Sequence, residues 1–179
     1  MVKPFQKSIG LLGGSFDPPH RGHLEISKIS IKKVKLSKVL WIVTKKNPFK
    51  NKPLYSLKQR VKLAKKISKN EKKIQVEYLD KTVKSSRVIN IISYLINKRK
   101  LKNIYFIVGS DNLIKFHKWK SWKKIVKLVK LIVFSRRGYD RKSKNSTVVK
   151  YFKNKIIFIK NKHFSFSSSK LRKIVQKNN

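Results

Sequence analysis

The chain has 179 residues, no cysteine, and 48 Lys and Arg against 7 Asp and Glu, for a formal net charge of +41. This length predicts one domain over residues 1–179, and the lack of cysteine excludes disulfides. The longest apolar run, Leu128–Phe134, contains Lys130, and Met1–Phe5 has no signal-peptide core, so we expect a cytoplasmic protein without membrane spans.

Apolar runs of strand length alternate with segments of helical period. The expected strands are Ile9–Leu12, Val39–Val43, Ile74–Leu79, Ile104–Val108, Leu131–Phe134 and Ile156–Ile159. The expected helices lie at Leu24–Val34, Leu57–Ile67, Val88–Ile96, Trp122–Val129 and Ser167–Gln176. The alternation predicts an α/β fold, a Rossmann-like doubly wound parallel sheet of about six strands with helices on both faces. The polar stretch Arg136–Ser146 is expected to be a mobile loop.

The first expected strand ends in a glycine turn that opens a helix. The stretch reads Gly13-Gly14-Ser15-Phe16-Asp17-Pro18-Pro19-His20-Arg21-Gly22-His23. Gly13 and Gly14 lack a Cβ, which permits a sharp turn and a close approach to phosphate, and a helix start attracts anions. His20 and His23 share one helix face and can both donate to phosphate oxygens, which predicts a nucleotide triphosphate site. The alternatives are two surface histidines or half of a metal site, although no third ligand stands nearby.

A second block, Val108-Gly109-Ser110-Asp111-Asn112-Leu113, follows the fourth expected strand. A carboxylate at Asp111 can accept both hydroxyls of a ribose, and its alternative role is a helix N-cap. Trp119 offers a flat face for an aromatic base, with core packing as its alternative. Trp122 is in phase with Ile125 and is expected in the core.

The third block, Phe166-Ser167-Ser168-Ser169-Lys170-Leu171-Arg172, places serines before a helical pattern. Ser167 and Ser168 would form a second anion site, and Arg172 could clamp phosphate oxygens from one turn further on. The alternative is an ordinary capped helix with a solvent-exposed arginine.

The positive charge has two explanations. Clustered basic residues would indicate nucleic-acid binding, whereas drift in composition would spread lysine over every exposed position. The lysines run from Lys3 to Lys177 and are not gathered in one patch, which favours drift. Either origin predicts weak non-specific binding to polyanions.

Together the three blocks resemble the bacterial nicotinate-nucleotide adenylyltransferases, of the nucleotidyltransferase superfamily with an H-x-G-H motif. The match covers almost the whole chain, and it includes Arg136-Arg137-Gly138 and the pair Val43-Thr44 followed by Asn47-Pro48-Phe49-Lys50. One departure concerns a Tyr-Thr pair that the family usually has near the pyridine ring. Val88 and Ile89 stand at those positions here, so a side-chain hydroxyl is missing.

The resemblance implies transfer of AMP from ATP to nicotinate mononucleotide in NAD biosynthesis, giving deamido-NAD and pyrophosphate. The implied catalytic residues are His20, His23, Lys50 and Arg172. The implied ATP-binding residues are Gly13, Gly14, Ser15, Phe16, Asp111, Ser167 and Ser168. The implied pyridine-nucleotide-binding residues are Asp17, Ile89 and Trp119. No residue is expected to bind metal, because Mg²⁺ would be carried mainly by the ATP phosphates.

Two other functions stay open from the sequence. One is a related adenylyltransferase that acts on phosphopantetheine or nicotinamide mononucleotide, and the other is a non-catalytic nucleic-acid-binding module. The expected partners are ATP and nicotinate mononucleotide, with no membrane, in a monomer or a small homo-oligomer.

Overall fold

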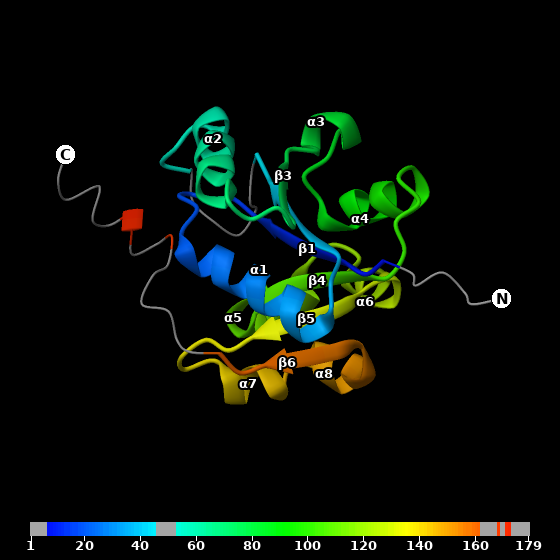
Figure 1. Cartoon of the computed structure of the whole chain (residues 1–179). Coiled ribbons are helices and arrows are strands. Elements are labelled where there is room, and N and C mark those ends of the chain that lie inside the picture. Colours follow the sequence, from blue (N-terminus) through cyan, green and yellow to red (C-terminus); the bar gives the residue numbers. More distant parts are fainter. Residues whose placement is uncertain (1–6, 46–52, 162–167, 169–170, 173–179) are drawn as a thin grey trace.

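The computed structural model describes residues 7–45, 53–161, 168, 171 and 172. Its centre is a sheet of six parallel strands in the order β3-β2-β1-β4-β5-β6 (Figure 1). The strands are β1 (Ile9–Gly14), β2 (Lys38–Val43), β3 (Ile74–Glu77), β4 (Ile104–Gly109), β5 (Lys130–Phe134) and β6 (Ile156–Ile159). The chain order reverses between β1 and β4, and ligands of such sheets bind beyond the carboxyl ends of the strands at this point.

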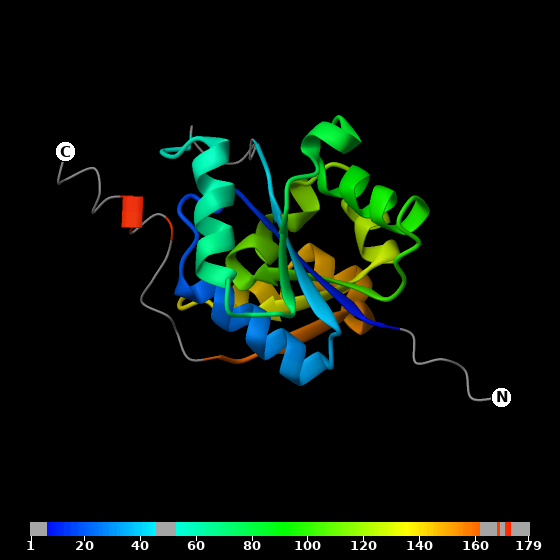
Figure 2. The ribbon, with the colours of Figure 1, turned by 45° about the horizontal axis from the view of Figure 1, so that its top comes forward.

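Helices cover both faces of the sheet, as expected from the sequence (Figures 1 and 2). The α-helices are α1 (Arg21–Val34), α2 (Leu57–Ser68), α3 (Asp80–Val83), α4 (Val88–Asn97), α5 (Ser110–Lys115), α6 (Trp122–Leu128), α7 (Asp140–Lys144) and α8 (Thr147–Phe152). Two 3₁₀ turns, η1 (Phe116–Lys118) and η2 (Lys153–Lys155), complete the described elements. The predicted doubly wound α/β fold is therefore confirmed.

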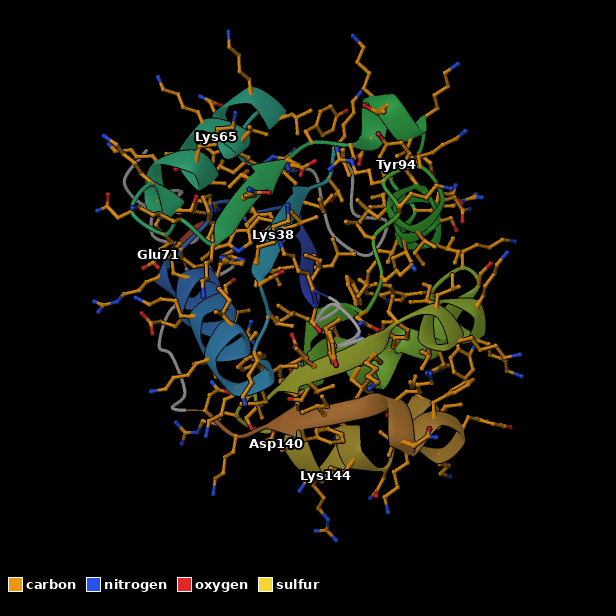
Figure 3. All side chains as sticks on the ribbon, turned by 45° about the vertical axis from the view of Figure 1, so that its right-hand side comes forward. Lys38, Lys65, Glu71, Tyr94, Asp140 and Lys144 are labelled. Atoms are coloured by element: carbon orange, nitrogen blue, oxygen red, sulfur yellow. The ribbon has the colours of Figure 1, made fainter. Side chains whose placement is uncertain are left out.

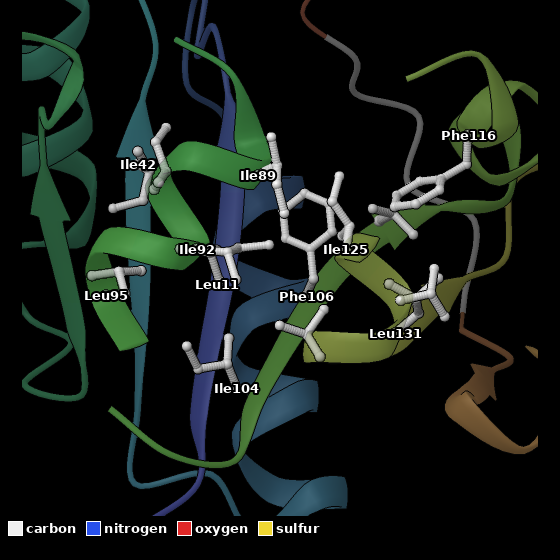
Figure 4. Close-up of a cluster of buried hydrophobic side chains, with 14 of the residues drawn as sticks. Leu11, Ile42, Ile89, Ile92, Leu95, Ile104, Phe106, Phe116, Ile125 and Leu131 are labelled. Carbon is white, nitrogen blue, oxygen red and sulfur yellow. The ribbon is translucent and has the colours of Figure 1, made fainter. Parts of the chain in front are cut away.

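The inner strands β1, β2, β4 and β5 are almost entirely apolar because both of their faces are buried, whereas the edge strands β3 and β6 carry polar or exposed residues. Leu11 packs into the cluster under α4, α5 and α6, whereas its neighbour Leu12 packs into the cluster under α1 and α2. In the first cluster, Figure 4 shows Leu11 and Phe106 of the sheet together with Ile92 of α4. Trp122 packs against this cluster as expected, although it is only partly buried.

The structure differs from the sequence-based expectation in the segment after β5. The prediction of a loop over Arg136–Ser146 is wrong for Asp140–Lys144, which form α7, while the residues on either side of α7 lie outside regular elements. Asp140 begins this helix and accepts hydrogen bonds from the Arg136 amide and from the Ser135 hydroxyl, which tie the segment to the sheet. Helical propensity alone does not reveal these bonds, because they come from the end of the preceding strand.

Two smaller differences concern element ends. β3 stops at Glu77 and does not reach Leu79, because Leu79 turns into the core and immediately precedes α3. The expected helix over Ser167–Gln176 lies mostly outside the described residues. Its described members, Ser168, Leu171 and Arg172, are helical.

Candidate active site

Gly13 and Gly14 are the last residues of β1 and pair in register with Ile42 and Val43 of β2. The ladder to β2 keeps both glycines in the strand, so the prediction that the chain turns at them is wrong. The left-handed residue is Phe16, with φ of 48°. The predicted close approach of a ligand keeps its basis, because both glycines line a cavity.

Aromatic packing holds Phe16 in this unfavourable backbone conformation. Phe16 is 2% exposed, and its ring stacks on Trp41 with 5.2 Å between centroids. The ring of Phe16 also contacts that of His23, with 4.7 Å between centroids. Trp41 is itself fixed, because its indole N–H donates to the Ser27 hydroxyl at 2.8 Å. A left-handed non-glycine residue costs on the order of 1 kcal/mol, which this packing offsets.

The two histidines of the H-x-G-H motif form a reciprocal cap at the start of α1. Nδ1 of His20 accepts from the Gly22 amide at 3.1 Å, and Nδ1 of His23 accepts from the His20 amide at 3.1 Å. An Nδ1 that accepts a hydrogen bond carries no proton, so these bonds assign each ring the tautomer with its proton on Nε2. Both rings, whose centroids are 4.0 Å apart, thus carry a donor at Nε2. The cap leaves the motif suited to an anionic ligand.

Arg60 of α2 ties together the loops around this motif, and the sequence reasoning missed it. Its guanidinium donates to the carbonyls of Ser15, of Thr44 at 2.8 Å, of Lys45 at 3.2 Å and of Tyr55 at 3.1 Å. The side chain is 2% exposed, and this burial lowers its pKa while Asp17 and Asp80 act in the opposite direction. The sequence did hold a signal for this role: Arg60 lies one turn before Ala64, on the apolar face of a helix whose other charged residues are lysines.

Asp17 connects three distant parts of the chain. Its carboxylate accepts from the amides of Leu54 at 3.0 Å and Tyr55 at 2.9 Å. Arg172 donates to the Asp17 carbonyl at 2.8 Å and lies 3.4 Å from the carboxylate, while Ser168 donates to the Pro18 carbonyl at 3.0 Å. The first and third sequence blocks therefore meet in space. The Asp17 carboxylate, however, is occupied by protein groups.

Asp111 lies in the first turn of α5, directly beyond the carboxyl end of β4. It makes no N-cap hydrogen bond; instead its Oδ1 is 3.8 Å from Nε of Arg136. A side chain at Gly109 would overlap this carboxylate and lie 3.2 Å from Nε of Arg136, so the glycine makes room for the pair. The capping alternative is thus not what the structure shows, and the carboxylate stands at the strand end where a ligand is expected.

A cavity of about 820 Å³ lies over the carboxyl ends of β1 and β2 and under α4 and α6. Its floor includes Gly13, Gly14 and Phe106, and its lining residues from the surrounding loops are Thr44, Lys84, Ser85, Ser86, Arg87, Lys118, Trp119 and Lys120. Trp119 stacks on Phe116 at 4.7 Å and contacts the core, yet it also lines the cavity, so its two alternative roles coexist. Four of the lining residues are cationic and none is acidic, which suits an anionic ligand.

The start of α4 forms one wall of the cavity. Ile89 is 7% exposed and belongs to the core cluster, as Figure 4 shows, whereas its neighbours Val88 and Ile91 line the cavity. A hydroxyl on this wall comes instead from Ser85, which lines the cavity and accepts from the Arg87 amide at 3.1 Å and from the Asn90 side chain at 2.9 Å. Ser85 was not among the predicted site residues.

Some predicted residues cannot be placed. Lys50 and Ser167, together with Asn47-Pro48-Phe49 and Phe166, lie outside the described residues. Within the described ranges, no group of three or more His, Asp or Glu residues is arranged to hold a metal ion. Lysines project from widely separated elements, for example Lys38, Lys65 and Lys144 in Figure 3, as drift in composition predicts. None of the described helices has the length and apolarity that a membrane crossing requires.

A family model described as cytidylyltransferase-like matches residues 11–174, which includes every block that forms this site. The chain therefore belongs to the cytidylyltransferase-like family. Among solved structures, nicotinic acid mononucleotide adenylyltransferase of Plasmodium falciparum complexed with NaAD matches with a TM-score of 0.77 at 20% identity. That match covers 97% of this chain and 86% of the other, and it supports the fold.

Curated relatives narrow the assignment. A probable nicotinate-nucleotide adenylyltransferase of Pelagibacter ubique (strain HTCC1062) is 49% identical over 97% of this chain and 100% of its own length. Another, of Clostridium novyi (strain NT), is 33% identical over 93% of this chain and 86% of its own length. These relatives place the chain among the nicotinate-nucleotide adenylyltransferases of the family.

Proposed function

We propose that the chain transfers AMP from ATP to the 5′-phosphate of nicotinate mononucleotide, giving nicotinate adenine dinucleotide (deamido-NAD) and pyrophosphate in NAD biosynthesis. The observation that carries the proposal is the shared position of two features. The glycine end of β1, which leads into the H-x-G-H motif, is also the floor of a cation-lined cavity that holds Trp119. Donor and acceptor can thus meet at one strand end.

The reaction needs alignment and charge stabilisation more than proton transfer. A phosphate oxygen of the mononucleotide attacks the α-phosphorus of ATP, and the bond from that phosphorus to the bridging oxygen breaks as pyrophosphate leaves. The attacking oxygen is already anionic, so no general base is required. Donors that meet the developing negative charge supply the main rate enhancement.

His20 and His23 would donate from Nε2 to the ATP phosphates, with His20 nearest the reacting phosphorus. Lys50, Ser167 and the rest of the third block would hold the β- and γ-phosphates. The proposed partners of the nucleotide are Gly13, Gly14, Ser15, Phe16, Ser168 and Arg172, with Asp111 on the ribose. Mg²⁺ would reach the site on the ATP phosphates and neutralise part of their charge, since the nearby Asp17 carboxylate already accepts two amide hydrogen bonds.

On the acceptor side, Trp119 would stack on the pyridine ring, and the cationic lining would attract the mononucleotide phosphate. Ile89 would bind the mononucleotide only through its backbone, because its side chain belongs to the core. Asp17 would act by holding Arg172 and the segment before α2. The proposal includes one nucleotidyltransferase domain in the cytoplasm, as a monomer or small homo-oligomer, with weak non-specific binding to polyanions.

Pyrophosphate release from Mg-ATP tests the proposal. Nicotinate mononucleotide, nicotinamide mononucleotide and phosphopantetheine are offered separately at moderate salt. We expect release with the nicotinate compound at a kcat/KM at least about tenfold above that for either alternative. Preference for another acceptor would reassign the substrate, and silence with all three from folded protein would favour the nucleic-acid-binding alternative.

Substitutions at two glycines of β1 distinguish an effect on stability from an effect on ligand binding. A Cβ at Gly10 would lie 2.8 Å from buried Leu36 and Val39, so Gly10→Ala should lower the free energy of unfolding by about 1–3 kcal/mol. A Cβ at Gly13 would lie 3.6 Å from Phe106, an ordinary contact, but it would enter the cavity. Gly13→Ala should therefore keep stability within about 0.5 kcal/mol, and it should raise the KM for ATP because Gly13 is a proposed contact of the donor nucleotide. Thermal melts and steady-state kinetics check both, and equal effects in the two variants would contradict the assignment.

Trp119→Ala should raise the KM for nicotinate mononucleotide about tenfold and leave the KM for ATP within about twofold, because of the two substrates only the acceptor is proposed to stack on Trp119. Trp122→Ala is the matched control, since Trp122 packs on Tyr151 and Phe152 away from the cavity lining. Steady-state kinetics with each substrate varied in turn measures the split. If both KM values stay unchanged in Trp119→Ala, Trp119 is only a core residue.

A further inference from the structure

Two acidic residues that the proposed reaction does not use occupy matching places in the fold. The chain has only seven Asp and Glu, and Asp80 and Asp140 each begin a short helix shortly after a strand, α3 after β3 and α7 after β5. Neither lines the cavity. Each instead binds groups that precede or follow residues of the proposed site.

Asp140 joins the ends of β4 and β5. Its Oδ1 accepts from the Ser110 hydroxyl at 2.9 Å and from the Arg136 amide at 3.0 Å, and its Oδ2 accepts from the Ser135 hydroxyl at 2.8 Å. Ser110 precedes Asp111, and the Arg136 side chain pairs with Asp111. Both residues of the ion pair are therefore set by a backbone that Asp140 holds.

Asp80 plays the corresponding part in the other half of the sheet, after β3. It is 7% exposed, and its Oδ2 accepts from the Lys45 amide at 2.8 Å and from the Ser86 hydroxyl. Lys45 follows Thr44, and Ser86 belongs to the segment Lys84–Val88; Thr44 and this segment both line the cavity. Asp80 thus links the end of β2 to the wall formed by the start of α4.

We propose that Asp140 and Asp80 are positioning residues for different substrates. Asp140 sets Asp111 and Arg136 for the nucleoside of the donor triphosphate, and Asp80 sets the cavity wall for the acceptor mononucleotide. The proposal rests on the proposed function for the identity of the two substrates. Its physical basis is that Asp140 accepts from groups at the ends of β4 and β5, whereas Asp80 accepts from groups at the end of β2 and before α4.

The alternative is that both residues only stabilise the fold. General loosening would change the KM values for both substrates together, whereas misplacement on one side of the cleft changes one of them. A displacement of about 1 Å at a positioned group can cost on the order of 100-fold, so a substrate-specific effect of about tenfold is a moderate expectation.

The test compares Asp140→Ala and Asp80→Ala in the full-length protein, with Glu71→Ala as a charge-matched control. Glu71 forms an exposed ion pair with Lys28 at 2.9 Å and lines no part of the cavity. Steady-state kinetics is combined with calorimetric binding of a non-hydrolysable ATP analogue. The binding measurement needs no turnover, so it reports on the donor side even if the acceptor has been assigned wrongly.

Asp140→Ala should weaken binding of the ATP analogue and raise the KM for ATP, each by about tenfold. The KM for nicotinate mononucleotide should stay within about twofold of the parent value. Asp80→Ala should show the reverse pattern, and Glu71→Ala should change neither. Asp140→Asn should restore most of the ATP affinity, because its amide oxygen can still accept from Ser110 and Arg136. Equal changes in both KM values, or none, would overturn the proposal.

If Asp140→Ala does not fold, Ser110→Ala removes the hydroxyl that donates to Asp140 and should raise the KM for ATP alone. For Asp80, the corresponding variant is Ser86→Ala, which should raise the KM for nicotinate mononucleotide alone. Effects of the serine variants on the opposite substrate would equally contradict the division of roles.

Discussion

His20→Asn should lower kcat by at least about 100-fold while the stability of the protein stays close to that of the parent. Removal of one preorganised donor from a transition state has a cost of this size. Asparagine is a favoured N-cap residue, so its side-chain oxygen can still accept from the Gly22 amide as Nδ1 of His20 does. What it cannot replace is the donor at Nε2. The variant therefore removes the chemistry and keeps the cap.

His20→Ala completes the comparison, because it removes both the donor and the cap. We expect the same loss of kcat together with a fall of about 1 kcal/mol in the free energy of unfolding, since an alanine at this position leaves the Gly22 amide without its acceptor. Pyrophosphate release and denaturant melts measure the two effects. If His20→Asn turned over within a few-fold of the parent, the motif would serve only to start α1 and His20 would have no catalytic role.

The order of strands and helices could be predicted because it depends on local patterns. Ile104–Val108 reads as a buried strand in the sequence, and the strand is found over Ile104–Gly109. The alternation of such runs with helical periods is enough for a parallel sheet with two covered faces. The position of the candidate site was predicted from the same rule: Gly13 and Gly14 end β1, and Asp111 lies just beyond the end of β4.

The supporting contacts could not be predicted, because they join side chains to backbone groups far away in the sequence. Arg60 binds carbonyls at Ser15 and Thr44, and a carbonyl has no identity that a sequence pattern could show. The same is true of the Lys45 amide that binds Asp80. The turn at Phe16 was missed for a related reason, since its left-handed backbone is held by rings from other elements.

Arg60→Leu should lower the free energy of unfolding by about 3 kcal/mol, which for a chain of this size corresponds to a fall in Tm of about 6–12 °C. The substitution removes the donor from four carbonyls in a region where Ser15 and Thr44 are themselves buried. Carbonyls left without partners away from water cost about 1–3 kcal/mol each, less whatever relaxation lets water reach them. Thermal melts at several salt concentrations measure the loss.

Arg21→Ala is the matched control, since Arg21 is exposed and its ion pair with Glu25, at 3.9 Å, should contribute less than about 0.5 kcal/mol. Arg60→Lys should fall between the two, because a single ammonium cannot reach carbonyls that the planar guanidinium bridges. Arg60→Leu and Arg60→Lys should also raise the KM values for both substrates, since Arg60 joins the end of β1 to the end of β2. A stable Arg60→Leu protein would mean that the aromatic packing of Phe16 and the Asp17 contacts hold these loops without the guanidinium.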